Sequence, residues 1–519
     1  MSEIFYFISA GFFAISLWMV MRYNLHMFQL NGYKNKEHRK WLLKNARNQL
    51  ILIPMLLVGI CVAIWSIIPL AIVSYIVYAG VIGYYFYLFR SNTKKKLVFT
   101  NRVRRLIVTD LIINTVAVVV APLLGQYAYI VPAALIFIQP ALVVLANIIN
   151  SPIEKNINNG YIKDAKKILA QMPSLKIIGV TGSYGKTSVK YYLQTLLKSK
   201  YNVLVTPASY NTPMGVVRTV REELKPIHEI FVCEMGARNI GDIKELCDIV
   251  HPHYGVITSI GPQHLETFIN MDNISNTKFE LADAIPDTGL IFLNGDNEYI
   301  NNKSVGYANK IFYSTTPREG SYYSDNIKVS QTGTEFDMVA PDGSRESFRM
   351  KLVGIHNVIN VAGAIAVANS LGIDFATLKM AVRKIQPVSH RMELIEKGNV
   401  TIIDDAYNSN PIGSKAAVET LAMFDGARIL ITPGMVELGA EEERFNYEFG
   451  TYAAKCCDYI ALVGKKHTEP IRKGIIESGF SEDRCKSFDR LEEALAFAYS
   501  IPTSEHKYIL LENDLPDNY

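Results

Sequence analysis

The apolar residues of this chain are distributed unevenly and divide it into two regions. Three long apolar runs fill the first 150 residues: Ile4–Met21, Ile51–Phe89 and Leu106–Ile149. A membrane-spanning helix needs about 20 apolar residues, so the second and third runs are each long enough for two spans. Pro69 lies near the middle of the second run, and the more polar segment Leu124–Tyr127 interrupts the third. The pattern therefore predicts an all-α membrane anchor of about five transmembrane helices in residues 1–150.

Basic residues gather in the two loops that would connect these spans on one side of the membrane. Each loop carries several of them: Arg22, Lys34, Lys36, Arg39, Lys40, Lys44 and Arg47 in the first, and Arg90, Lys94, Lys95, Lys96, Arg102, Arg104 and Arg105 in the second. Loops rich in lysine and arginine stay in the cytoplasm. Five spans then put the N-terminus outside the cell and everything after about residue 150 in the cytoplasm. We expect a multi-pass protein of the plasma membrane, in contact with membrane lipid.

Three polar residues, Asp110, Asn114 and Gln139, lie within or near the predicted spans. Polar groups inside a membrane are costly and often functional. Two interpretations stay open. These side chains contact a lipid substrate, or they have no such role and Asp110 simply faces the nearby basic loop.

The rest of the chain alternates short β-branched runs with amphipathic helical segments. Strand-like runs include KIIGV, YNVLVT, EIFVCE, YGVITSI and GLIFLN, which predict a mostly parallel sheet with helices on both faces. A segment rich in Gly, Ser and Tyr at about 314–350 predicts additional β structure, and VINVAGAIAVANSLG predicts a helix. A second alternation, with VTIIDDAY, ARILITPG, YIALVGK and KYILLEN, follows Gln386. We expect a linker at 151–174, a central α/β domain at 175–386 and a Rossmann-like α/β domain at 387–519.

Composition argues against several classes of function. The net charge of +4 over 519 residues is too small to indicate nucleic acid as a partner. None of the six cysteines forms a CxxC pair, so neither a zinc ribbon nor a redox motif is supported. We expect reduced thiols, as in cytosolic proteins.

The strongest local motif is GVTGSYGKTS, from Gly179 to Ser188. A predicted strand precedes it and a predicted helix follows it, and this order is typical of a phosphate loop that binds a nucleotide. Val180 replaces the first glycine of the full pattern, so the shorter TGxxGKT form applies. In such a loop, backbone N–H groups face the phosphates, a lysine reaches the terminal phosphates and a hydroxyl binds Mg²⁺. The candidate nucleotide-binding residues are Gly182, Ser183, Gly185, Lys186, Thr187 and Ser188.

Three further residues follow the loop as candidates for metal binding or catalysis. Glu234 ends the apolar strand in EIFVCEMG, where a carboxylate is placed to hold Mg²⁺; a surface glutamate is the alternative. His264, in TSIGPQHLE, is either a ligand of a second metal ion or a solvated loop residue. Lys278, in NTKFEL, would ordinarily be a solvated surface lysine.

Seven motifs in a fixed order give the chain a family resemblance. The phosphate loop is followed by EMG, SIGPQHLE, KFE, GIHNVIN, HRME and IDDAYNSNP, and this succession, over about Ile177–Gly464, resembles the Mur ligase family of ATP-dependent amide ligases. IDDAYNSNP and PGMVELG are most similar to the members that add D-alanyl-D-alanine to a UDP-linked muramoyl tripeptide. YNTPMG, with Asn211, Pro213 and Gly215, resembles the loop on the acceptor side.

The resemblance implies roles for residues around the phosphates of ATP. Lys186 would bind the β- and γ-phosphates, Thr187 and Glu234 would hold one Mg²⁺, and His264 would join a second Mg²⁺. Lys278 matches a lysine that family members carbamylate, which converts a cation into an anion able to position Mg²⁺. Catalysis would thus depend on Lys186, His264 and Lys278.

The resemblance also implies contacts with the rest of the nucleotide. Asn357, in GIHNVIN, matches an asparagine that contacts adenine. The C-terminal domain would reach the nucleotide or shape its site through a larger set: Arg391, Asp405, Tyr407, Asn408 and Asn410. A site built from two domains predicts closure of the C-terminal domain about a hinge near Pro387.

The implied reaction makes an amide bond through an acyl phosphate formed from the acceptor carboxylate, with an amine as the second substrate. Two features depart from the family. The predicted spans replace the domain that binds the UDP-sugar, which makes a lipid-linked acceptor reasonable, and the chain ends in YILLENDLPDNY where the D-alanyl-D-alanine enzymes carry a KGSR-type motif. We expect a membrane-anchored peptide ligase of cell-wall precursors. The alternatives are a ligase for another polymer, such as poly-γ-glutamate, and a nucleotide-binding membrane scaffold without catalysis.

Overall fold

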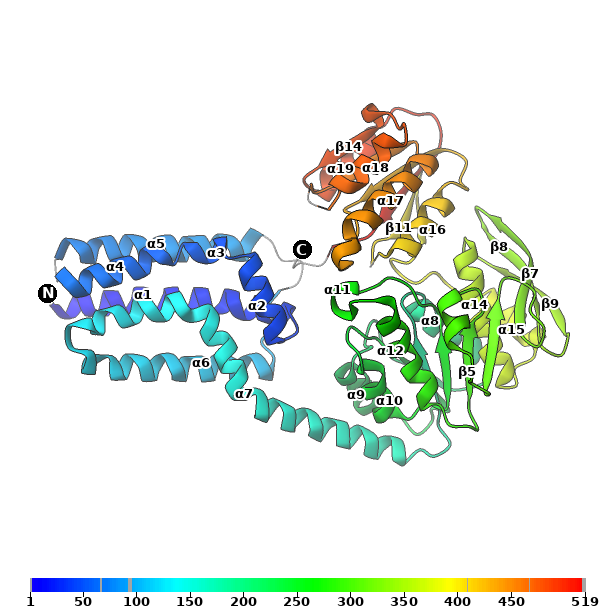
Figure 1. The fold of residues 1–519 in the computed structure, drawn as a ribbon, viewed down its shortest axis with the longest axis horizontal. Coiled ribbons are helices and arrows are strands. Elements are labelled where there is room, and N and C mark those ends of the chain that lie inside the picture. The colour runs from blue at the N-terminus through cyan, green and yellow to red at the C-terminus, as the bar shows by residue number, and fades with distance from the viewer. Residues whose placement is uncertain (1, 66–67, 92–95, 408, 466, 516–519) are drawn as a thin grey trace. The chain divides into compact units, whose positions relative to one another are not determined.

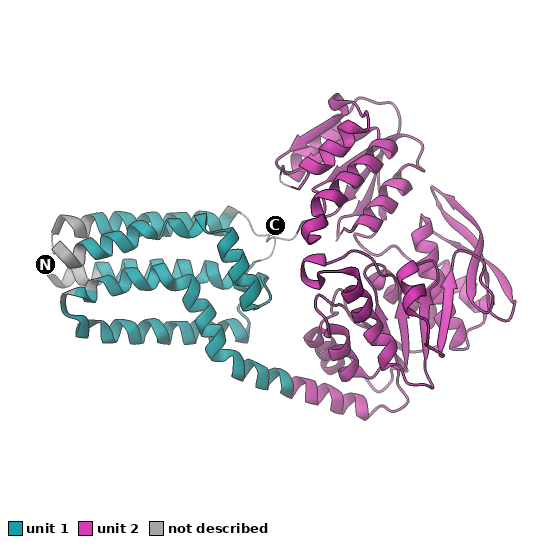
Figure 2. Ribbon diagram, in the orientation of Figure 1, with its two compact units in different colours: residues 1–159, 516–519 teal, residues 160–515 magenta. Residues whose placement is uncertain are grey.

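The computed structural model describes residues 2–65, 68–91, 96–407, 409–465 and 467–515, which form two compact units (Figure 1, Figure 2). Unit 1 ends at Asn159, and unit 2 spans Gly160–Leu515. The described part of unit 1 is helical, and unit 2 contains both β-sheets.

Unit 1 is built from helices of very different length. They are α1 (Ser2–Leu30), α2 (Asn35–Lys44), α3 (Arg47–Leu50), α4 (Ile53–Trp65), α5 (Ile68–Ser91), α6 (Asn101–Val120), the 3₁₀ segment η1 (Ala121–Tyr129) and α7 (Ile130–Ala170). One apolar cluster joins α1, α5 and α7 through Leu17, Tyr85 and Ile136. A second joins α1, α6 and α7 and includes Phe28 and Val143. The all-α anchor expected from the sequence thus has a packed interior of its own.

One break expected inside the apolar runs, Leu124–Tyr127, lies in η1. Pro69, the other expected break, lies in the first turn of α5, and residues 66–67 before it are outside the described residues. Gly125, inside η1, has a φ of 58° and a ψ of −128°. This backbone conformation is not helical, so the helical path is interrupted at Gly125. Three stretches of the described residues are long and apolar enough to cross a membrane: Ile8–Leu30, Asn101–Gly125 and Ile130–Ala170. The count of five spans stays a prediction.

The segment expected as a linker, 151–174, is mostly helical, because α7 continues through it to Ala170. The last turns of α7 belong to unit 2. There Ala165 is buried in the apolar core of the central domain, and Asp164 forms an ion pair with Arg221 at 2.6 Å. This end of the helix is therefore fixed to the central domain.

A nine-stranded sheet forms the central domain, with strand order β2-β3-β1-β4-β5-β6-β7-β8-β9. Its strands are β1 (Lys176–Thr181), β2 (Val203–Val205), β3 (Ile230–Glu234), β4 (Tyr254–Ile257), β5 (Leu290–Asn294), β6 (Lys310–Ser314), β7 (Tyr322–Ser330), β8 (Gly333–Val339) and β9 (Arg345–Met350). The strands pair in parallel from β2 to β7, and β7, β8 and β9 pair antiparallel. The mostly parallel sheet and the added β structure near 314–350 are both as expected.

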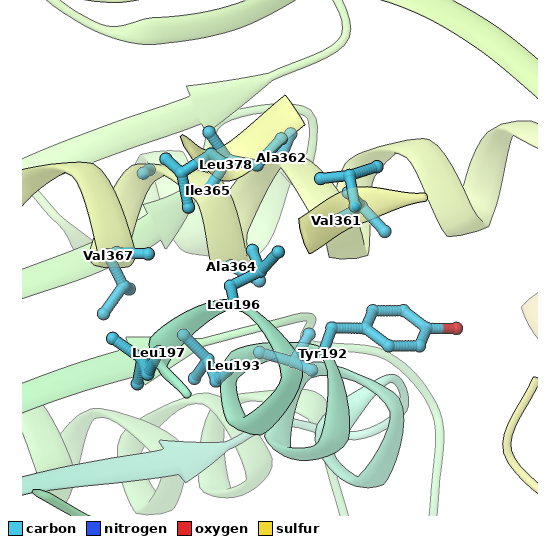
Figure 3. Close-up of a cluster of buried hydrophobic side chains, with 14 of the residues drawn as sticks. Tyr192, Leu193, Leu196, Leu197, Val361, Ala362, Ala364, Ile365, Val367 and Leu378 are labelled. Atoms are coloured by element: carbon cyan, nitrogen blue, oxygen red, sulfur yellow. The ribbon is translucent and has the colours of Figure 1, made fainter. Parts of the chain in front are cut away.

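Helices cover both faces of this sheet. They are α8 (Lys186–Leu197), α9 (Pro213–Glu222), α10 (Asp242–Val250), α11 (Leu265–Phe268), α12 (Met271–Ala284), α13 (Glu298–Lys303), α14 (Ile355–Ser370) and α15 (Phe375–Val382). Successive residues of a strand point to opposite faces, so Ile178 packs toward α8 and α14, whereas Ile177 packs toward α9, α10 and α12. Figure 3 shows Leu193 and Leu196 of α8 against Ala364 of α14, a small residue that lets the two helices approach closely.

The C-terminal domain has a six-stranded sheet of order β10-β11-β15-β12-β13-β14. Its elements are β10 (Glu393–Lys397), β11 (Val400–Asp405), α16 (Pro411–Leu421), β12 (Ala427–Thr432), η2 (Gly439–Glu441), α17 (Glu442–Cys456), β13 (Tyr459–Val463), α18 (Glu469–Glu477), η3 (Glu482–Arg484), β14 (Cys485–Phe488), α19 (Leu491–Ser500) and β15 (Lys507–Glu512). Only β10 runs antiparallel to its neighbour. The six cysteines of the whole chain are free thiols, as expected.

Candidate active site

The phosphate-loop motif connects β1 to α8, in the strand, loop and helix order that its sequence predicts. Gly182 (φ 153°) and Gly185 (φ 81°) take backbone conformations that L side chains rarely adopt. A Cβ on Gly182 would lie 2.1 Å from the Thr258 hydroxyl, and a Cβ on Gly185 would lie 2.7 Å from the side-chain oxygen of Asn360. The backbone of the loop is therefore packed closely against its neighbours, which fixes its shape.

Ser183 and Ser188 contribute to the fold of this loop. Ser183 Oγ donates to the carbonyl oxygen of Gly261 at 2.9 Å and accepts from its N–H at 3.0 Å, which ties the loop to the segment after β4. Ser188 is buried in the first turn of α8, beside the hydroxyl of Tyr192. Contact of either serine with a nucleotide stays a prediction.

Lys186 is held by the loop itself. Its Nζ donates to the carbonyl oxygens of Gly182 at 2.7 Å and Ser183 at 3.1 Å. Burial lowers the pKa of Lys186 to about 8, with the charge of Arg391 adding to the effect and that of Glu234 opposing it. A phosphate beside this ammonium group would favour its charged form.

Glu234 lies at the carboxyl end of β3 and is 1% exposed. Its Oε1 accepts hydrogen bonds from the Thr187 hydroxyl at 3.1 Å and from Asn211 Nδ2 at 3.0 Å. Its Oε2 forms an ion pair with Lys190 Nζ at 3.0 Å. The surface alternative for Glu234 is thus wrong, because the side chain is buried beside the phosphate loop.

Thr187 and Glu234 fit the binding of Mg²⁺. Both offer hard oxygen atoms, and Mg²⁺ in phosphate-transfer sites usually takes one or two protein oxygens together with phosphate and water. Among the described residues, no group of three or more His, Cys, Asp or Glu side chains is arranged to hold a metal ion.

His264 follows β4 and has a left-handed φ of 53°. Its Nδ1 is hydrogen-bonded to a carboxylate oxygen of Glu437, in the loop 433–439 of the C-terminal domain, and Arg238 lies 3.4 Å from the same carboxylate. Burial lowers the pKa of His264, and because the partner of Nδ1 is a carboxylate, Nδ1 is the ring nitrogen that donates. A metal ion ligated by His264 would be bound through Nε2, with Glu437 orienting the ring.

Lys278 lies in α12 and is 2% exposed, so the expectation of a solvated surface lysine is wrong. Burial and then the nearby charge of Lys186 lower its pKa well below that of a free lysine. A neutral amine is the form that reacts with carbon dioxide, so this environment suits carbamylation. Its neighbour Glu280 has another role, because it accepts from the N–H groups of Gly241 and Lys244, both at 2.8 Å, at the start of α10.

Asn357 is buried at the start of α14. Its Nδ2 donates to the carbonyl oxygen of Val353 at 2.9 Å, and its Oδ1 accepts from the Tyr192 hydroxyl at 2.9 Å. The bond to Tyr192 joins α14 to α8, and contact with adenine stays a prediction.

The C-terminal domain brings a cation toward the phosphate loop. The Arg391 guanidinium lies over the ring of Tyr407, 4.3 Å from its centre, and Tyr407 is also hydrogen-bonded to Ser209 of the central domain. Asp405 ends β11, and burial raises its pKa to about 7, with Arg391 opposing and Glu512 adding to the increase.

Two other residues of this domain, Asn408 and Asn410, were predicted to reach the nucleotide or shape its site. Asn410 accepts from the N–H of Gly413 at 2.9 Å and thereby caps α16. Asn408 lies outside the described residues, so its role stays a prediction.

Three residues of this region were missed by sequence reasoning as functional candidates: Lys190, Glu437 and Glu512. Lys190 follows Lys186 by one helical turn, so the spacing alone could have placed both on one face of α8. Glu512 is buried and accepts from the hydroxyl of Thr432 at 2.6 Å and from Ser409. Glu437 lies within PGMVELG, one of the motifs that carry the resemblance, but nothing in that motif indicates its partner His264, which is in the other domain.

Two segments of unit 2 match known protein families. Residues 180–368 match the Mur ligase middle domain, and residues 390–511 match the glutamate ligase domain of Mur ligases. The chain belongs to the Mur ligase family. Both matches lie after the predicted membrane anchor, and together they cover the phosphate loop, Glu234, Lys278 and the C-terminal sheet.

Two named enzymes and one solved structure are similar to this Mur ligase over more than half of its length. The UDP-N-acetylmuramoyl-tripeptide–D-alanyl-D-alanine ligase of Escherichia coli (strain K12) is 29% identical over 62% of this chain and 73% of its own length. The enzyme of the same name from Bacillus subtilis (strain 168) is 30% identical over 55% of this chain and 62% of its own length. The crystal structure of MurF ligase from Thermotoga maritima in complex with ADP is 25% identical, covers 69% of this chain and 80% of that chain, and superposes with a TM-score of 0.62. The chain thus spans about two thirds of the length of these relatives.

Proposed function

We propose that this Mur ligase joins D-alanyl-D-alanine, or a related amine, to the free carboxylate of a muramoyl tripeptide, at the expense of ATP and in the synthesis of peptidoglycan. The observation that carries the proposal is that Glu234, at the end of β3, lies against Lys186 and Thr187 of a phosphate loop in the Mur ligase middle domain. The names of the relatives supply the substrates.

The family implies the chemistry, and the side chains present are of the types that it needs. A carboxylate oxygen of the acceptor attacks the γ-phosphorus of ATP, the bond to the β-phosphate oxygen breaks, and ADP leaves. The amine nitrogen then attacks the acyl carbon of the acyl phosphate, loses a proton, and inorganic phosphate leaves as the amide forms. Lys186 and Arg391 supply positive charge where phosphate oxygens gather, in a buried site where such charge is effective.

Mg²⁺ bound to Thr187 and Glu234 would offset the negative charge of the phosphates as a Lewis acid. We propose that a second Mg²⁺ is positioned by His264 and by Lys278 in its carbamylated form. The burial of the Lys278 amine, which lowers its pKa, and the fixed ring of His264 support this assignment.

We further propose that unit 1 is the membrane anchor, with five spans, the N-terminus outside and unit 2 in the cytoplasm. Its three long apolar stretches support the proposal. The anchor stands where the family carries its UDP-sugar domain, so the acceptor is either UDP-linked or lipid-linked. Labelling of single introduced cysteines from either side of intact cells would test the orientation, and labelling of the residue 34–47 loop from outside would reject it.

Phosphate release by the detergent-purified chain tests the ligase. ATP and Mg²⁺ would be supplied with D-alanyl-D-alanine and either UDP-linked or lipid-linked muramoyl tripeptide. Release with coupled product on one acceptor would establish the reaction and identify that acceptor. No stimulation by either would reject this substrate pair, and activity with glutamate-type acceptors would instead favour a ligase for another polymer.

A further inference from the structure

Lys190 is a buried cation that the proposed reaction does not use. It lies on α8, one turn after Lys186, and is 0% exposed. Its Nζ lies 3.0 Å from Oε2 of Glu234 and donates to the carbonyl oxygen of Ala208 at 2.6 Å. A buried charge is stable only when it is paired, so these two contacts account for the presence of a lysine here.

The two carboxylate oxygens of Glu234 have different partners. Oε2 faces Lys190, whereas Oε1 accepts from Thr187 and Asn211. The oxygen beside the hydroxyl of the phosphate loop is therefore Oε1. A Mg²⁺ shared with Thr187 would contact Glu234 through that one oxygen.

The second partner of Lys190 belongs to the loop Thr206–Asn211, which connects β2 to α9. Ala208 has a left-handed φ of 41°, a conformation that a residue with a Cβ holds only when its surroundings fix it. Asn211, at the end of this loop, bonds to Glu234 through its side chain and accepts at its carbonyl from Gly236 N–H at 2.8 Å. The last two residues of the loop, Tyr210 and Asn211, begin YNTPMG, the segment that resembles the acceptor-side loop of the family.

We propose that Lys190 is a positioning residue that couples the metal site to the acceptor side of the enzyme. It confines the metal contact of Glu234 to Oε1 and, through Ala208, holds the loop Thr206–Asn211 so that Asn211 meets the same carboxylate. The inference rests on the proposed function, because that function assigns Thr187 and Glu234 to the metal bound with the nucleotide. A lysine with a purely structural role would stabilise the fold without linking the two sites.

Hydrogen–deuterium exchange of the loop measures this coupling without reliance on turnover. The detergent-purified full chain would be compared in ADP with Mn²⁺ and in ADP with a chelator. Because coupled sites influence each other reciprocally, Mn²⁺ should slow exchange of residues 206–211 at least fivefold in the wild type. In Lys190→Met, this metal-dependent slowing should disappear. Lys200→Met is the matched control, because Lys200 also caps a carbonyl, that of Gly372 at 2.7 Å, and should keep the wild-type response.

Two results would overturn the proposal: exchange of the loop that does not respond to Mn²⁺ in the wild type, or a response that persists in Lys190→Met. The wild-type comparison needs no substitution, so a loop that does not respond to Mn²⁺ would overturn the proposal even if Lys190→Met does not fold. Failure of the proposed function would look different, since the chain would then release no phosphate with any muramoyl tripeptide while the exchange response to ADP and Mn²⁺ stayed measurable.

Discussion

Glu437 of the C-terminal domain is hydrogen-bonded to His264 of the central domain. The same carboxylate lies 3.4 Å from Arg238, and the carbonyl oxygen of Glu437 accepts from Glu266 N–H at 3.4 Å. One residue thus contacts three groups of the other domain. These contacts hold the loop 433–439 against the segment that follows β4, beside the phosphate loop.

Substitution of this residue should therefore weaken the contact between the two domains. A hydrogen bond to a charged group contributes about 1.5–3 kcal/mol, so Glu437→Gln should lower kcat/KM for ATP by roughly tenfold to a hundredfold. Steady-state kinetics would measure it, with Glu443→Gln, an exposed glutamate of α17, as control. Equal kcat/KM values for both variants and the wild type would show that the contact does not contribute to the active arrangement.

Carbamylation of Lys278 can be detected directly. The wild-type chain in ¹³C-bicarbonate should show a carbamate carbon signal that Lys278→Ala lacks and that Lys303→Ala, which alters an exposed lysine of α13, retains. We expect Lys278→Ala to lose activity by about a hundredfold or more, since a charged group that positions the metal is removed. Added acetate should restore part of it. Full activity of Lys278→Ala without acetate would show that the carbamate is not needed.

The buried carboxyl of Glu512 should make stability depend on pH. Burial raises its pKa to about 7, so between its ordinary pKa and 7 the folded chain binds more protons than the unfolded chain. Stability should then fall as the pH rises through this window, by about 1–3 kcal/mol. Glu512→Gln should remove the part of that dependence that Glu512 contributes and leave the part due to Asp405, whose pKa burial also raises to about 7. Glu505→Gln, at an exposed site, should keep the whole dependence.

Unfolding midpoints at pH 5 and pH 8 would measure this dependence for the two variants and the wild type. The same substitution removes a charge that raises the pKa of Asp405, so the pKa of Asp405 should decrease in Glu512→Gln. An unchanged pH dependence in Glu512→Gln would assign the titration to another group.

Gly182 should tolerate no side chain. Gly182→Ala would place a Cβ 2.1 Å from the Thr258 hydroxyl, so the loop must shift, and we expect nucleotide affinity to fall by about tenfold or more. Gly343→Ala is the control, because Gly343 also has a positive φ (83°) but nothing lies within 4 Å of its added Cβ. Binding of a fluorescent ATP analogue would compare the two variants. If both bind as the wild type does, the close packing at Gly182 is not needed for nucleotide binding.

The parts of the site that could be predicted are those with a local signature. The phosphate loop is contiguous in sequence, and Glu234 could be placed because it ends a continuous apolar strand. The burial of Lys278 could not be predicted, because it depends on how α12 packs against the sheet. The pairing of Glu437 with His264 joins residues 173 positions apart, and no periodicity in either segment indicates it.

The fold shows the same division. The apolar runs of the first 150 residues and the strand and helix alternation of the rest could be read directly. The helix through 151–174 was missed because the segment is polar overall, although Ile162, Ala165, Ile168 and Leu169 have the spacing of one helical face. The order of the nine strands depends on crossovers between distant segments, which a single sequence does not specify.

The hydrogen bonds of Lys186 to the carbonyl oxygens of Gly182 and Ser183 have a thermodynamic consequence for ligand recognition. A phosphate that binds the Lys186 ammonium group must replace the hydrogen bonds that this group already donates to the two carbonyl oxygens. Calorimetry should therefore report a smaller favourable enthalpy for the terminal phosphate than its contacts in a complex would suggest, since the measured heat is the difference between two sets of hydrogen bonds.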